Sequence, residues 1–212
     1  MPFGEEDVRQ IAAAISAAEE KRRAYADFWS SGFDRPVGET EIARILTQFL
    51  KSQGLAVSEL RHRGEGNDPP DCELELESGE LIGIEITELV NQKTVERHAS
   101  AQKRGLPPDP SDVASWTPAS LIGGISARLR AKDVPIDKRK GGPFARYVVL
   151  ISTDEPMIQL DMAWEILRCT PFRTVAIDEA YLLILYHPTD GFGFPEGYPI
   201  VKIDVQRERA IA

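Results

Sequence analysis

The sequence has few of the residues that zinc sites, secreted folds or membrane spans require. Its two cysteines, Cys72 and Cys169, form no C-x-x-C pair. The three histidines, His62, His98 and His187, are widely spaced, so we expect no zinc cluster. No apolar run approaches the roughly 18 residues that a membrane-spanning helix needs, and the acidic first residues lack the apolar stretch of a secretory signal. These features predict a cytoplasmic protein with reduced cysteines and no membrane partner.

The chain also lacks overall positive charge. Its formal net charge is −9, which argues against a protein whose whole surface binds nucleic acid. Residues 64–92 contain nine acidic residues and no Lys or Arg, whereas residues 128–146 contain seven basic residues against two acidic ones. This contrast favours either a metal site beside a phosphate-binding track or two solvated surfaces of opposite charge. The candidates for phosphate contacts are Arg128, Arg130, Lys132, Lys138, Arg139 and Lys140.

Apolar residues that recur every three or four positions predict several helices. The first covers residues 5–29, an N-terminal extension suited either to dimerisation or to packing on its own domain. The second runs from about residue 39 to residue 53, and Gly54 suits the position just after a helix end. Thr117-Pro118 has the residue types of a helix cap and a first helical position. Weaker patterns favour helices over residues 92–104 and 158–167.

Alternation between apolar and polar residues predicts strands. Residues 72–76 and 82–87 alternate in this way, and the Ser78-Gly79 turn between them predicts a hairpin. A short strand near residues 55–59 precedes the hairpin. Residues 147–151 are continuously apolar, as in a strand buried on both faces. Two more strands are expected over residues 181–186 and 198–205.

The resulting order predicts an α/β fold in which helices flank a mixed sheet. The core order is a helix, three strands, a helix and a strand. We expect a single domain with an N-terminal helical extension over residues 1–35, this core over residues 38–152, and further α/β elements over residues 153–212.

Two carboxylates in the hairpin predict a metal site. Asp71 stands at the start of one strand and Glu85 lies within the next, and adjacent strands are roughly 5 Å apart. Hard cations such as Mg²⁺ or Mn²⁺ prefer oxygen ligands. The main-chain carbonyl of Ile86 could add another oxygen ligand to the two carboxylates. Such an ion can polarise a phosphodiester and lower the pKa of an attacking water. The hairpin therefore favours metal-assisted hydrolysis.

These residues resemble a known nuclease signature. Asn67-Asp68-Pro69-Pro70-Asp71, followed after thirteen residues by Glu85-Ile86-Thr87, is similar to the motif of the PD-(D/E)XK superfamily, whose members include restriction endonucleases. The order of elements over residues 38–152 also resembles that superfamily's core. The resemblance implies a restriction-endonuclease-like fold and a Mg²⁺- or Mn²⁺-dependent nuclease that acts on DNA, with RNA as the alternative substrate.

The resemblance also implies a carboxylate on the first core helix. Glu39 lies three residues before Ile42, on the inward-facing stripe of that helix, whereas Glu41 lies about 100° away from it. Glu39 is therefore the expected third carboxylate ligand, with Glu41 in reserve.

The superfamily's lysine is absent from its usual place, where this chain has Thr87. Its charge would act on the nucleophile or the phosphate. One interpretation is that a lysine reaches the site from elsewhere, with Lys93 and Lys132 as candidates. A second is that Thr87 and water suffice. A third is that catalysis is lost and the domain binds nucleic acid or protein. An unrelated alternative is a dimeric assembly or regulatory protein built on the 5–29 helix.

Overall fold

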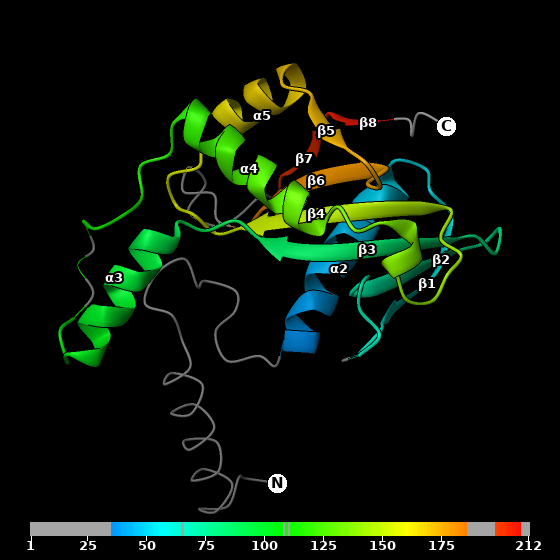
Figure 1. Cartoon of the computed structure of the whole chain (residues 1–212), viewed down its shortest axis with the longest axis horizontal. Coiled ribbons are helices and arrows are strands. Elements are labelled where there is room, and N and C mark those ends of the chain that lie inside the picture. The colour runs from blue at the N-terminus through cyan, green and yellow to red at the C-terminus, as the bar shows by residue number, and fades with distance from the viewer. Residues whose placement is uncertain (1–34, 65, 108, 110, 186–197, 209–212) are drawn as a thin grey trace, which may run out of the picture.

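A six-stranded mixed sheet forms the centre of the protein in a computed structural model (Figure 1). The structure describes residues 35–64, 66–107, 109, 111–185 and 198–208. The strand order is β1-β2-β3-β4-β6-β7. The strands span Val57–His62 (β1), Cys72–Leu76 (β2), Leu81–Glu88 (β3), Arg146–Thr153 (β4), Glu179–Ile184 (β6) and Ile200–Ile203 (β7).

Strand direction changes across the sheet. β1, β2 and β3 form an antiparallel meander, β3, β4 and β6 are parallel, and β7 is antiparallel to β6. A separate parallel pair joins β5 (Phe172–Thr174) to β8 (Val205–Arg207). The parallel strands β3, β4 and β6 therefore end at one edge of the sheet, which is where α/β proteins commonly bind ligands.

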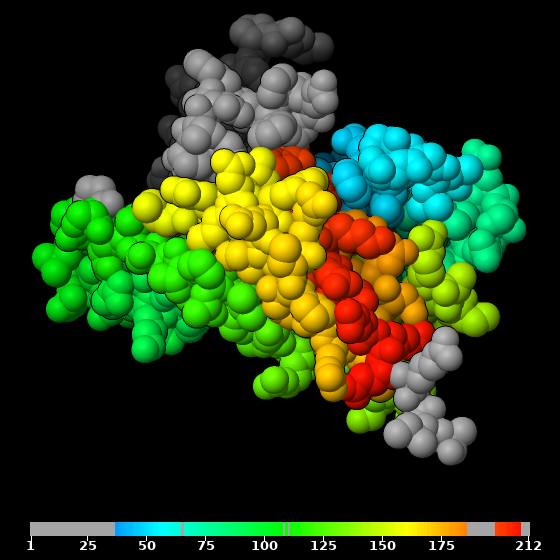
Figure 2. Space-filling model, turned by 90° about the horizontal axis from the view of Figure 1, so that it is seen from above, coloured from blue at the N-terminus to red at the C-terminus, as the bar shows by residue number. Residues whose placement is uncertain are grey.

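Helices cover both faces of the sheet, which confirms the predicted α/β class. The helices are α2 (Arg35–Ser52), α3 (Gln92–Lys103), α4 (Pro118–Lys132) and α5 (Leu160–Cys169), with a 3₁₀ turn η1 at Ile136–Lys138. In Figure 1, α2 lies behind the sheet and α4 in front of it, while α3 stands apart at one end. Seen from above in Figure 2, α5 lies on the surface between the green helices and the red C-terminal strands.

The alternation of strand residues produces two apolar cores. On one face, Ile82, Ile84 and Ile86 of β3 share a cluster with Leu46 and Leu50 of α2. On the other face, a second cluster joins alternate residues of β4 to α4 and α5 (Tyr147, Val149, Ile151, Leu121, Ile125, Leu129, Ala163 and Leu167). β4 contributes to both clusters, so the prediction of a strand buried on both faces is confirmed.

The element boundaries differ from the predicted ones for local reasons. α2 begins at Arg35, before the expected start near Glu39. Pro36 stands in its first turn, where a missing N–H is harmless because the first helical N–H groups have no intrahelical acceptor. β1 covers residues 57–62 rather than 55–59, because its pairing with β2 extends to His62. The helix expected over residues 5–29, and any dimer built on it, lie outside the described residues.

The predicted start of α4 is confirmed. The Thr117 side chain accepts a hydrogen bond from the N–H of Ser120, and the Ser120 hydroxyl accepts one from the N–H of Thr117. This reciprocal capping box, followed by Pro118 at the first helical position, satisfies otherwise unpaired N–H groups. The cap sets the residue at which α4 begins, and Leu121, Ile125 and Leu129 pack the helix against the sheet.

Two adjacent glycines in α4 provide a matched test of its packing. A Cβ at Gly123 would meet no atom within 4 Å, whereas a Cβ at Gly124 would lie 2.8 Å from Leu89 Cδ1. We expect Gly123→Ala to raise the free energy of unfolding by about 0.5–1 kcal/mol, because alanine is the better helix former. Gly124→Ala should gain less or lose stability, because the buried Leu89 must shift. Urea unfolding of both variants checks this, and equal gains would contradict the packing.

Candidate active site

Asp71 and Glu85 lie opposite each other where β2 meets β3. β2 pairs with β3 up to Cys72↔Ile84, and one further step of the same register brings Asp71 opposite Glu85. The ladder does not continue through Pro70, which has no N–H to donate. Asp71 Oδ2 instead accepts the N–H of Ile86 at 2.7 Å. The proline that ends the ladder thus places a carboxylate at the sheet beside Glu85.

Glu85 is held by two groups from distant parts of the chain. Lys132, in the last turn of α4, forms an ion pair through Nζ with Glu85 Oε1. The hydroxyl of Tyr147, on β4, donates to Glu85 Oε2 at 3.2 Å. The Glu85 side chain is 5 % exposed and that of Lys132 is 25 % exposed. The carboxylate is therefore almost enclosed, and its cation remains partly open to solvent.

Of the two lysines that the sequence offers for the missing motif position, Lys132 is the one that contacts Glu85. It approaches from the helix on the sheet face that carries Glu85, and 47 residues separate the pair in the chain. Lys93 is exposed in the first turn of α3. Thr87, in the motif position itself, is half-buried near the end of β3.

The electrostatics of the site follow from burial and crowded negative charge. Burial raises the pKa of Glu85, and the charge of Asp71 raises it further, while Lys132 and Tyr147 oppose the rise. Burial also raises the pKa of the Cys72 thiol to about 12, and the charges of Asp71, Glu39 and Glu85 contribute in that order. Three carboxylates thus act on one point of the structure, and Cys72 is a thiol at neutral pH.

Glu39 reaches this region from the opposite face of the sheet. Its Oε2 lies 2.9 Å from His62 Nε2, and its side chain is 14 % exposed. His62 Nδ1 accepts the N–H of Gly64 at 3.0 Å, so the ring proton is on Nε2 and His62 donates to Glu39. Glu41, in contrast, is 54 % exposed and pairs with Arg44. The structure therefore places Glu39 inward and Glu41 outward, as the helical spacing predicts.

The donor set suits a hard cation but is engaged by protein groups. Asp71, Glu85 and the Ile86 carbonyl offer the oxygen ligands that Mg²⁺ or Mn²⁺ prefers. Within the described part of the chain, no three His, Cys, Asp or Glu side chains are already gathered as a metal-binding group. At Glu85 the two carboxylate oxygens instead face Lys132 and Tyr147. The ammonium of Lys132 stands where a bound cation would neutralise Glu85.

The basic residues predicted to contact phosphates have unequal surroundings. Arg139 lies over the Tyr147 ring, with Cζ 3.7 Å from the ring centroid, and donates to the carbonyls of Val134 and Ala176. Lys140 Nζ donates to the Gly66 carbonyl at 2.8 Å. Arg130, Lys138 and Lys140 are exposed, and Arg128 is half-buried. The exposed members remain candidates for phosphate contact, whereas Arg139 supports Tyr147.

The sequence patterns miss three further residues near the site. Tyr147 lies in an apolar run that indicates only a buried strand, and its hydroxyl becomes relevant once β4 lies beside β3. His62 ends β1, where nothing in the sequence indicates its contact with Glu39. Arg63 donates to the Lys140 carbonyl and lies over the Phe144 ring at 5.6 Å, so it joins the loops before β2 and β4. Only the folded chain brings these groups together.

Comparison with known proteins leaves the family open. No protein-family model matches the chain, and neither the curated proteins nor the solved structures contain a significant match. Among the described helices, none is both long and apolar enough to cross a bilayer.

The buried charge of Glu85 predicts a pH-dependent difference in stability. The pKa of Glu85 is raised above its ordinary value of 4.5, so the ionised form costs stability at neutral pH and that cost is relieved as the pH falls through the folded-state pKa. We expect Glu85→Gln to have the larger free energy of unfolding at neutral pH, because Lys132 can still reach solvent. The advantage over the wild type should shrink on acidification.

Urea unfolding of both proteins across this pH range measures the difference. Glu41→Gln, on the exposed side of α2, is the matched control and should change stability little. A Glu85→Gln effect that does not vary with pH would contradict the account of the buried charge.

Proposed function

We propose that the chain is a divalent-metal-dependent nuclease of the PD-(D/E)XK type that hydrolyses DNA phosphodiester bonds. The contact between Lys132 and Glu85 carries this proposal. It supplies, from α4, the positive charge that the motif lacks at Thr87. The lysine reaches the same carboxylate that the motif would use, next to Asp71. The chain would then differ from the signature only in the element that provides the lysine, which is α4 instead of β3.

The arrangement of elements supports the same proposal. A three-stranded antiparallel meander leads into a parallel β3–β4 pair, with α2 on one face and α4 on the other. This arrangement resembles the restriction-endonuclease-like core that the motif implies. α3 is an insertion between β3 and α4. Glu155, fully buried after β4, accepts hydrogen bonds from Asn91 N and from Trp116 Nε1, which ties both ends of the insertion to the sheet.

Each residue has a role that its surroundings suggest. Asp71, Glu85 and the Ile86 carbonyl would hold the cation, while Glu39, on the other face of the sheet and bonded by His62, would add negative charge nearby. A bound Mg²⁺ or Mn²⁺ would polarise the phosphate and lower the pKa of the attacking water. Lys132, once released from Glu85, offers its ammonium to the phosphate oxygens, where charge develops during hydrolysis.

Two neighbouring groups support these roles. Tyr147 orients Glu85 through its hydrogen bond. The Thr87 hydroxyl adds a donor or acceptor close to the nucleophile.

A binding-only protein is the second candidate, and the burial of the carboxylates favours it. Asp71 is 5 % exposed and Glu85 is 4 % exposed. Both already have protein partners. A chain that had lost catalysis could keep this arrangement as a structural ion pair and use its exposed basic residues to bind nucleic acid. The two candidates differ in whether Lys132 matters for cleavage or only for stability.

Cleavage by matched lysine variants tests the proposed function. We expect the wild type to cleave plasmid or branched DNA with Mg²⁺ or Mn²⁺. Asp71→Asn, Glu85→Gln and Lys132→Met should each lower the rate by about 10²-fold or more, because each removes a ligand or a charge from the reacting phosphate. Lys93→Met is the control and should keep the wild-type rate. Thermal unfolding of each variant confirms that it is folded.

Two results would overturn parts of this assignment. If Lys132→Met cleaved DNA at the wild-type rate, Lys132 would have no role in catalysis. DNA binding without any cleavage by the wild type in either metal would favour the binding-only protein.

A further inference from the structure

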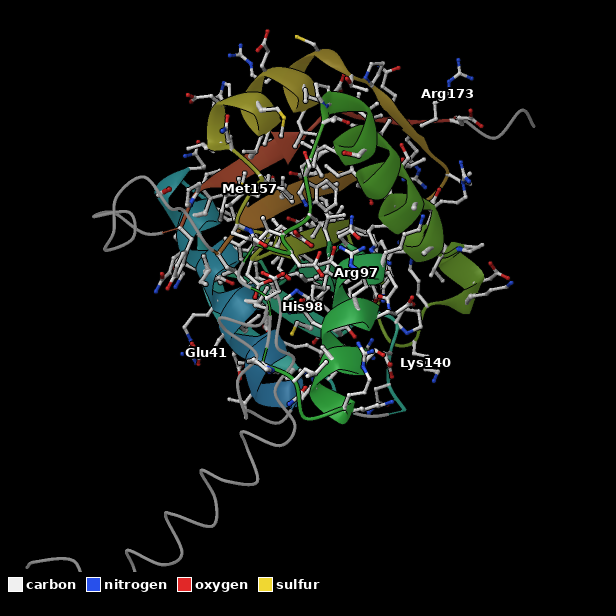
Figure 3. The ribbon with its side chains drawn as sticks, turned by 90° about the vertical axis from the view of Figure 1, so that its left-hand side faces the viewer. Glu41, Arg97, His98, Lys140, Met157 and Arg173 are labelled. Carbon is white, nitrogen blue, oxygen red and sulfur yellow. The ribbon has the colours of Figure 1, made fainter. Side chains whose placement is uncertain are left out.

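A cavity of about 730 Å³ lies at the edge where the parallel strands end. Its walls come from α2 between Val37 and Gln48, from the ends of β3 and β4, and from Leu185 and Tyr198. Figure 3 views the molecule from this end, with Glu41 on α2 to one side and Arg97 and His98 on α3 to the other. The volume falls within the roughly 300–1,000 Å³ of pockets that bind small molecules.

The cavity borders the candidate active site, although Asp71 and Glu85 are not among its lining residues. Glu39, Ile86 and Thr87 line it. Ile86 is bound through its N–H to Asp71, and Thr87 follows Glu85 by two positions. If Asp71 and Glu85 held a phosphate, the nucleotide that carries this phosphate could therefore reach the cavity.

The chemistry of the walls suits a base better than a phosphate. Ile42, Ile45 and Leu185 provide apolar surface, and Tyr198 provides an aromatic ring. The carboxylates of Glu39, Glu41, Glu88 and Asp154 also line the cavity, and Arg44, which lines it too, is paired with Glu41. Carboxylates repel the phosphodiester backbone but accept hydrogen bonds from the amino and ring N–H groups of bases. Apolar and aromatic walls bind the flat face of a base through stacking and burial.

We infer that this cavity binds a single unpaired nucleobase, next to the phosphate held at Asp71 and Glu85. The inference rests on the proposed function and narrows its substrate class. A base in a duplex is stacked and paired, so it would have to leave the helix to enter. The preferred substrate is therefore single-stranded DNA or a frayed DNA end.

Binding of normal and abasic DNA to the wild-type protein tests the inference. The probes are a short fluorescent single-stranded oligonucleotide and an abasic oligonucleotide of the same length, with Ca²⁺ in place of Mg²⁺ so that binding is measured without turnover. We expect roughly tenfold weaker binding of the abasic probe, because base stacking on aromatic and apolar groups is lost. Equal affinity for the two probes would overturn the inference without reference to any variant.

A cavity-filling variant locates the effect. Ile45→Trp places an indole in the cavity and should remove most of the preference for bases. Ile166→Trp, at a half-buried isoleucine of α5 on the other face, is the matched control and should keep it. A preference that persists in a folded Ile45→Trp protein would place the base elsewhere and overturn the inference.

Metal dependence separates this inference from the proposed function. The preference for the normal probe over the abasic probe could be unchanged both without Ca²⁺ and in Asp71→Asn. That result would support base binding in the cavity and contradict the metal site. If both the preference and its dependence on Asp71 are observed, the two sites act on one ligand.

Discussion

The ion pair between Glu85 and Lys132 is the interaction on which the arrangement of the site depends. A carboxylate enclosed in a sheet is strongly disfavoured unless it has a partner and hydrogen bonds. Lys132 provides the charged partner from α4, which packs on the face of β3 that carries Glu85. Tyr147 provides a hydrogen bond from β4, the strand beside β3. The pair thereby fixes the end of α4 over the middle of β3. It also keeps a cationic group beside Glu85.

The same pair occupies one oxygen of a carboxylate that the proposed metal site would use. The Lys132 ammonium neutralises Glu85 in the absence of a divalent ion. A cation held by Glu85 in the proposed site would compete with Lys132 for Oε1, and the lysine side chain is 25 % exposed, so it could turn toward solvent. In the proposed nuclease, the displaced ammonium would lie near the phosphate, so that metal binding and release of the lysine would occur together.

Much of the site follows from local rules. The hairpin alternation puts Asp71 and Glu85 on one face, and helical spacing separates Glu39 from Glu41; the structure shows both. The partners of these carboxylates could not be derived in that way. Tyr147 is 62 residues from Glu85, and its position depends on the β3–β4 register, which no local pattern specifies.

The fold shows the same division between local and distant causes. The cap of α4 and the buried β4 follow from a few neighbouring residues. The extent of β1 depends on pairing with a strand further along the chain. Among the seven basic residues that the charge pattern groups together, Lys132 pairs with a carboxylate and Arg139 lies over an aromatic ring. A charge pattern identifies a basic segment, but it does not show which contact each of its residues makes.

The most direct measurement is a crystal structure of the protein soaked in Mn²⁺, with the anomalous signal of the metal recorded. The account predicts an anomalous peak between Asp71 and Glu85, coordinated by the Ile86 carbonyl, with Lys132 Nζ moved away from Glu85. An intact Lys132–Glu85 pair with no peak at this place, in crystals that bind Mn²⁺ elsewhere, would contradict it.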